Sequence, residues 1–117
     1  MSTETVKKPR VFVTHETSLD FLDAERYGEI VFLTRDDLHN IKNSLHNESV
    51  LRFIREGLRD YDPEVDWVVI AGSPYVAAAV FLMLGHKKIQ QVRVLRWSNR
   101  DRAYLPMYLD LRREVTQ

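Results

Sequence analysis

The sequence predicts an α/β fold: a Rossmann-like, three-layer, open and mostly parallel sheet of about five strands that ends in a C-terminal antiparallel hairpin. Segments with strand composition alternate with segments of helical character, the pattern of parallel strands joined by right-handed crossovers. The segments 29–34 and 66–71 are apolar without alternation, as expected for strands covered on both faces. The 117 residues are enough for one domain, 1–117.

The first two strands flank a short helix. Residues 10–14 are β-branched and aromatic and predict a strand. Residues 19–26 favour a short helix that Ser18 caps and Gly28 ends. The second strand, 29–34, follows directly. We therefore expect a compact strand–helix–strand unit at the start of the sheet.

A longer helix leads to the third strand. Residues 35–46 are ambiguous, a loop or an irregular helix. Asn47 then has the character of an N-cap for an amphipathic helix that ends before Pro63. Its apolar stripe consists of Val50, Leu51, Ile54, Leu58 and Tyr61.

The third strand, 66–71, turns directly into a buried helix. Ser73 as cap and Pro74 at the first helical position are a strong start signal. The helix is apolar nearly all round to about Leu84, and Gly85 is its expected end.

The C-terminal part predicts the hairpin. Residues 91–97 alternate apolar and polar side chains, 98–102 are turn residues, and 103–109 form an edge strand because Pro106 is tolerated only at an edge. Residues 1–8 and 112–117 are expected to be flexible tails.

Composition excludes several classes of protein. The chain has no cysteine, which excludes disulfide scaffolds and thiolate metal sites and suits a reducing compartment. The net charge is zero, so we expect no nucleic-acid and no membrane partner. No apolar run approaches the length of a membrane span. We expect a cytoplasmic protein without a cofactor or a metal site, since the four histidines lack metal-site spacing.

The stretch from Gly72 to Tyr75 is the first candidate ligand site. In open parallel sheets, ligands bind beyond the carboxyl ends of the strands. There, Gly72 allows close backbone approach, the helix start at Ser73 and Pro74 favours an anion such as phosphate, and Tyr75 offers a stacking face. A well-capped buried helix that binds nothing is the alternative.

Two further loops are expected at the same edge. Thr14, His15 and Glu16 follow the first strand, and Thr34 ends the second. His15 and Glu16 suit acid–base chemistry, and Asp20, Asp23 and Glu25 suit a glycosidase-like or deoxyribosyl-transfer site. Solvated loop residues and the polar face of a short helix are the simpler interpretations, and we assign no catalytic residue.

The hairpin turn combines Trp97 and Arg100 with further arginines. Residues 89–113 carry 6 Lys or Arg against 2 Asp or Glu, whereas residues 14–66 carry 6 against 13. Aromatic and cationic groups together suit stacking and phosphate contacts. Charges on an edge strand also serve to prevent edge-to-edge pairing.

The stretches DAERYGEIVFLT at 23–34 and VVIAGSP at 68–74, with a late strand ending near Trp97, resemble small proteins of tailed bacteriophages. The resemblance spans nearly the whole domain and implies a phage protein at work in the host bacterial cytoplasm. It supplies no activity, so no residue gains a catalytic role from it. Phages encode small proteins that capture nucleotide immune signals of the host, a task that would suit this chain.

The leading hypothesis is a non-catalytic binding protein for a small phosphate-bearing, nucleotide-like ligand. Its hypothesised task is that of a phage anti-defence protein that sequesters a nucleotide immune signal. The second is a nucleotide or nucleoside N-glycosidic hydrolase or transferase that uses His15, Glu16 or Asp23. The third is a protein–protein interaction module, in which an exposed hairpin edge favours a homo-oligomer.

Overall fold

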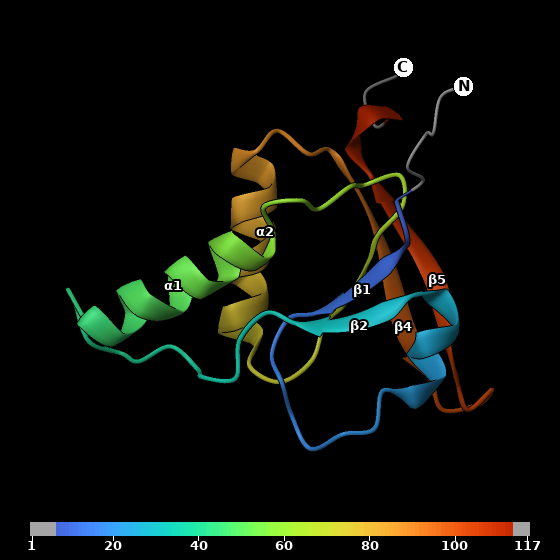
Figure 1. Cartoon of the computed structure of the whole chain (residues 1–117), viewed down its shortest axis with the longest axis horizontal. Coiled ribbons are helices and arrows are strands. Elements are labelled where there is room, and N and C mark those ends of the chain that lie inside the picture. Colours follow the sequence, from blue (N-terminus) through green and yellow to red (C-terminus); the bar gives the residue numbers. More distant parts are fainter. Residues whose placement is uncertain (1–6, 114–117) are drawn as a thin grey trace.

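One five-stranded sheet organises the computed structural model, which describes residues 7–113 (Figure 1). Its strand order is β2-β1-β3-β4-β5, with the first four strands parallel and β5 antiparallel to β4. The strands are β1 Arg10–Val13, β2 Glu29–Phe32, β3 Trp67–Val69, β4 Gln91–Ser98 and β5 Ala103–Asp110. The predicted α/β class and C-terminal antiparallel pair are confirmed.

Both α-helices lie on one face of the sheet, where they bury a large apolar core. Helix α1 spans Leu45–Gly57 and α2 spans Pro74–His86. Figure 1 shows the two helices together on the same side of the strands. Buried residues of the two helices pack on buried residues of β1, β3 and β4. From the helices these are Val50, Ile54, Val76, Val80 and Leu84, and from the strands Phe12, Val68, Val92 and Val94.

The helix ends differ slightly from the sequence prediction. The cap of α1 is Ser44, not Asn47: the Ser44 hydroxyl accepts the Asn47 N–H at 3.1 Å. The Asn47 side chain instead holds the backbone of His39. Helix α2 starts at Ser73 and Pro74 as predicted but runs through Gly85, and the left-handed residue that follows it is Lys88.

On the opposite face, the sole helix within residues 7–113 is a 3-10 helix, η1 Leu22–Tyr27. Phe21 and Ala24 from this segment pack on a second core that includes Val11, Trp67 and Leu95. The predicted short helix is therefore present in a tighter, shorter form. The Rossmann-like three-layer arrangement is not confirmed, because this face has the short 3-10 helix η1 of 6 residues where a full helical layer was expected.

The connections create a switch point between β1 and β3. The chain leaves β1 through η1 towards β2, whereas β3 continues through α2 towards β4 on the other side. Strand β3 is short and pairs with β4 only at Val68 and Val94. The carboxyl-terminal half of β4 therefore extends beyond β3, accompanied only by β5.

Segment η1 also blocks the outer edge of β5. The Tyr104 N–H donates to the Asp23 carboxylate at 2.7 Å. The Tyr104 carbonyl accepts from the Arg26 guanidinium at 2.8 Å and the Tyr27 hydroxyl at 3.0 Å. Both polar groups of Tyr104 thus point away from β4, and strand alternation turns the nitrogen of Pro106 the same way, where proline has no proton to donate.

A buried carboxylate closes the amino end of the sheet. Asp66, fully buried, accepts hydrogen bonds from the backbone N–H groups of Arg10 and Asp62 and from the Lys7 ammonium. Lys7 and Arg10 also donate to the carbonyl of Asp60. Because three donors converge on it, the Asp66 charge is compensated.

The expected tails lie mostly outside the described residues, which begin at 7 and end at 113. Within that range Lys7 is tied to Asp66, and a 3-10 turn, η2 Leu111–Arg113, follows β5. No helix in the described part of the chain is long and apolar enough to cross a membrane. The cytoplasmic location stays a prediction.

Candidate functional site

Thr14 joins the carboxyl ends of β1 and β3. Its hydroxyl donates to the carbonyl of Ala71 and accepts the Ala71 N–H, both at 3.0 Å. Thr14 is completely buried, and both hydrogen-bonding functions of its hydroxyl are used. Its role in the structure is to fix where the β3–α2 loop starts.

His15 is held against the Gly72 turn. The Ser73 N–H donates to Nδ1 of His15 at 2.9 Å, so the neutral ring carries its proton on Nε2. Gly72 has φ +68°, and a Cβ there would lie 2.3 Å from Nδ1 of His15. Only glycine combines that backbone conformation with room for the ring.

The start of α2 is capped from within the chain. The Ser73 hydroxyl accepts the N–H groups of Tyr75 and Val76, and it donates to the Asp37 carboxylate, which is the main reason that the pKa of Asp37 lies below its ordinary value. The Ala77 N–H bonds the Ser73 carbonyl. The first-turn N–H groups therefore all have partners, and a carboxylate already stands at the helix start.

Glu16 and Thr34 continue this network. The Glu16 N–H donates to the Thr34 carbonyl at 2.8 Å, and the Glu16 carboxylate pairs with Arg35 at 3.4 Å. The Thr34 hydroxyl bonds the backbone of Asp36. The structure thus brings the predicted residues of the three strand-end loops together, but as mutual partners.

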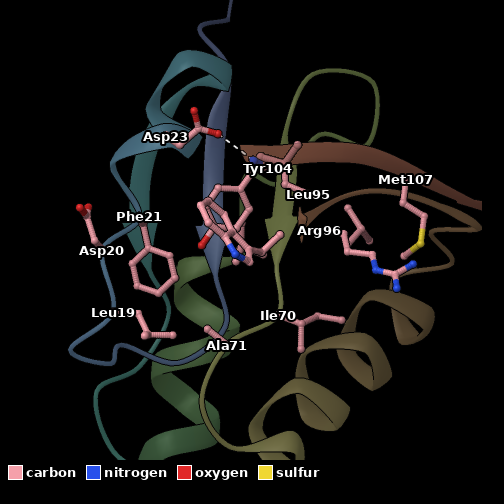
Figure 2. Close-up of a pocket in the computed structure, with 13 residues that line it drawn as sticks. Leu19, Asp20, Phe21, Asp23, Ile70, Ala71, Leu95, Arg96, Tyr104 and Met107 are labelled. Atoms are coloured by element: carbon pink, nitrogen blue, oxygen red, sulfur yellow. Dashed lines mark hydrogen bonds between the residues drawn. The ribbon is translucent and has the colours of Figure 1, made fainter. Parts of the chain in front are cut away.

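A pocket of about 600 Å³ lies beside this network (Figure 2). It occupies the space where β4 extends beyond β3, with η1 and its preceding loop as the opposite wall. Figure 2 shows Leu19 and Phe21 on one side, Arg96 and Met107 on the other, and Ile70 and Ala71 below. The lining is mainly apolar and aromatic: Leu19, Phe21, Val69, Ile70, Ala71, Val94, Leu95, Trp97, Tyr104 and Met107, with Asp20, Asp23 and Arg96 as its charged members.

The two carboxylates of the pocket have structural partners. Asp20 accepts the Leu22 N–H at 2.8 Å and so starts η1. Asp23 binds the Tyr104 N–H and pairs with Arg26 at 3.4 Å. His15 and Glu16 do not line the pocket. The residues considered for acid–base catalysis are therefore divided between two places.

A polar hollow at the hairpin turn adjoins the pocket. Its lining includes Ser98, Asn99 and Arg100, and it shares Arg96, Trp97 and Met107 with the pocket. Trp97 is 42% exposed, stacks edge-on against Tyr104 at 5.1 Å, and donates from Nε1 to the Asn99 side chain at 2.9 Å. The Trp97 ring is therefore both accessible and fixed in orientation.

The predicted site residues outside the strand-end network fall into two groups. Trp97 and Arg100 line the adjoining hollows, whereas Pro74 and Tyr75 are exposed at the start of α2 and line neither. Sequence reasoning missed Phe21, Ile70, Leu95 and Tyr104 as pocket residues. Phe21 and Leu95 were recognisable only as core candidates, and Ile70 became available because β3 ends one residue before it.

The histidines do not form a metal centre. His39 and His46 stack with ring centroids 3.9 Å apart, and His46 bonds the Asp37 carbonyl through Nε2. Within residues 7–113 no group of three or more His, Cys, Asp or Glu side chains has an arrangement that could hold a metal ion. This cluster shapes the loop before α1.

Residues 8–111 match the family described as Phage Pam3 gp32-like protein, and the chain belongs to this family. No curated protein and no solved structure matches the chain. The family membership identifies a phage protein, in agreement with the resemblance in the sequence.

Proposed function

We propose that the chain is a non-catalytic binding protein for a small nucleotide-like ligand, with the base in the apolar pocket and the phosphate at the hairpin. The observation that carries this proposal is the continuity of the two hollows through Arg96 and Trp97. One hollow is apolar and the other cationic, and a nucleotide has the same division.

The pocket has the size and chemistry for a planar ring. Its volume of about 600 Å³ lies within the usual range for small-molecule sites. Trp97, 42% exposed, offers an aromatic surface, and Ile70, 51% exposed, gives the base an apolar floor, while the buried Phe21 forms part of the wall. Stacking on such surfaces contributes about 1–3 kcal/mol per base.

The phosphate is proposed at Arg96 and Arg100, in place of the start of α2. The N–H groups there already have partners, and the Asp37 carboxylate would repel an anion. The guanidinium groups of Arg96 and Arg100 have no ion-pair partner among the described residues, and both line the hairpin hollow. Arginine forms charge-assisted hydrogen bonds with phosphate.

The proposal of a non-catalytic role is supported by how two of the candidate side chains are used. A general base needs a free basic atom within reach of the substrate. Nδ1 of His15 accepts a hydrogen bond from the Ser73 N–H, and the Asp23 carboxylate accepts one from the Tyr104 N–H of β5. In a phage protein, binding without turnover suits sequestration of a nucleotide signal of host defence, and we include that task, in the host cytoplasm, in the proposal.

The test is calorimetric titration with nucleosides, nucleoside phosphates and cyclic nucleotides, with tryptophan fluorescence as a second readout. Trp67 is buried, so quenching would report on Trp97. We expect Trp97→Ala to weaken binding about tenfold or more, because a stacking surface is lost. Arg100→Gln should weaken binding of the phosphorylated ligand and leave the nucleoside unaffected.

Two matched variants serve as controls. Arg102→Gln removes the same charge from the same turn without touching either hollow, and Tyr75→Ala removes an exposed aromatic ring at the start of α2. Both should bind normally. Absence of heat across the panel, or loss of binding in Tyr75→Ala but not in Trp97→Ala, would refute the placement of the ligand.

A further inference from the structure

We infer that copies of this chain associate head to tail, with the acidic surface of η1 on one copy docking into the groove between α1 and α2 of the next. The inference rests on two surfaces that each expose leucine side chains and that carry opposite charge. Leu19 and Asp20 of this acidic surface also line the ligand pocket, but the residues that test the inference do not, so association can be measured separately from ligand binding.

The groove is a hollow of about 450 Å³ on the outer side of the two helices. Its apolar floor includes Leu51, Leu58, Ala79 and Met83, and Leu82 stands at its rim with 76% of its surface exposed. Covering such an exposed leucine with another apolar surface is favourable, because it removes apolar surface from water.

The ionisable side chains that line the groove are all of the basic residue types. Arg55, His86 and Lys87 line it, and no Asp or Glu is among its described lining residues. Lys87 donates to the carbonyl of Leu58 at 2.7 Å, which fixes its ammonium at one end. Arg55 has no ion-pair partner within the described chain. The groove therefore suits an apolar partner flanked by carboxylates.

The segment from Leu19 to Glu25 offers such a partner. Leu19 and Leu22 are 65% and 64% exposed, and Asp20 and Glu25 are exposed beside them in sequence. The one basic residue that follows, Arg26, is engaged with Asp23 and the Tyr104 carbonyl. This surface, the acidic patch, is thus apolar and negative.

The two surfaces cannot meet within one copy, because α1 and α2 cover one face of the sheet and η1 the other (Figure 1). Contact between copies is therefore heterologous, and each added copy presents a new groove or patch. Such an arrangement closes as a ring or continues as a filament. Edge-to-edge pairing through β5 is unavailable, since Tyr104 and Pro106 block that edge.

The decisive experiment mixes two variants that each lack one surface. Leu82→Glu places a carboxylate in the groove and leaves the acidic patch intact. Leu22→Lys replaces an exposed leucine of the patch by a cation, which the basic groove should repel, and leaves the groove intact. We expect the unmodified protein to self-associate with rising concentration in sedimentation velocity and native mass spectrometry. Each variant alone should be monomeric, and an equimolar mixture should form a 1:1 dimer that goes no further.

Controls separate association from misfolding. Both leucines are exposed, so circular dichroism and thermal unfolding should be nearly unchanged. Leu45→Glu changes an exposed leucine of α1 outside the groove and should leave association intact. The mixed dimer should weaken as salt is raised, because the contact pairs opposite charges. A monomer at every concentration, association that survives both substitutions, or a mixture that stays monomeric would overturn the inference.

Discussion

The two ends of the sheet differ in how the chain uses its polar groups. At the amino end, Asp66 is fully buried and gathers Lys7, Arg10 and Asp62 around one carboxylate. At the carboxyl end, polar groups also bind one another, yet an apolar pocket of about 600 Å³ remains open beside them. The comparison indicates that the amino end serves stability, whereas the carboxyl end combines a rigid frame with a free surface.

The largest expected effect on stability is at Asp66, at the amino end of the sheet. Asp66→Ala removes the acceptor for three donors and should lower the free energy of unfolding by about 3–5 kcal/mol, the cost of breaking a buried ion pair. Urea denaturation measures it. Asp60→Asn is the control, because it also removes one negative charge while the Asp60 backbone carbonyl keeps its contacts. Equal losses in the two variants would contradict the structural role of Asp66.

The second prediction compares two glycines. Gly72→Ala should cost about 2–3 kcal/mol, because alanine resists a positive φ and its Cβ displaces the His15 ring from the Ser73 N–H. Gly85→Ala, in α2 with open space around it, should instead stabilise the protein by about 0.5–1 kcal/mol. Thermal unfolding of both variants tests the contrast, and a stabilised Gly72→Ala would rule out the geometry of the turn.

The third prediction concerns Thr14, whose hydroxyl joins the carboxyl ends of β1 and β3 beside the pocket. Thr14→Val keeps the shape but leaves the N–H and carbonyl of Ala71 without a partner, at a cost of about 2 kcal/mol. Thr14→Ser retains the hydroxyl and should lose less. Ala71 lines the pocket, so Thr14→Val should also weaken ligand binding in the calorimetric titrations.

The smallest effect concerns Asp37. Its pKa is lowered in the folded protein, chiefly by the Ser73 hydroxyl, so its contribution to stability is present at neutral pH and is lost as the pH falls below about 4. Because the carboxyl is exposed, the effect should be small. Titration of the Asp37 carboxyl by NMR should give a lower pKa in the unmodified protein than in Ser73→Ala. An unchanged pKa would show that the hydroxyl is not its partner.

Much of the fold could be predicted because local signals agreed with it. The apolar strands, the start of α2 at Ser73 and Pro74, and the edge position of Pro106 each follow from residue chemistry. A second helical layer was predicted, but the structure has η1 in its place. The residue composition of this segment cannot distinguish a short α-helix from a 3-10 helix. The Asn47 cap was displaced because Ser44, three residues earlier, offers the same hydrogen bond.

The candidate site was predicted only in part. The rule that ligands bind at strand ends brought Thr14, His15 and Ser73 together correctly in space, but it does not reveal that they bind one another. The pocket depends on a length difference between β3 and β4 that only the register shows. Trp97 was identified because an aromatic beside arginines at a turn is unusual enough to stand out.

The blocked outer edge of β5 also affects how the chain would aggregate. A strand from a neighbouring chain needs a run of free N–H groups to extend a sheet, and β5 interrupts that run at Tyr104 and again at Pro106. The other edge, β2, is four residues long. A variant that loosens η1 would release the backbone of Tyr104, and amyloid-like growth would be expected to start there before any loss of the helical face.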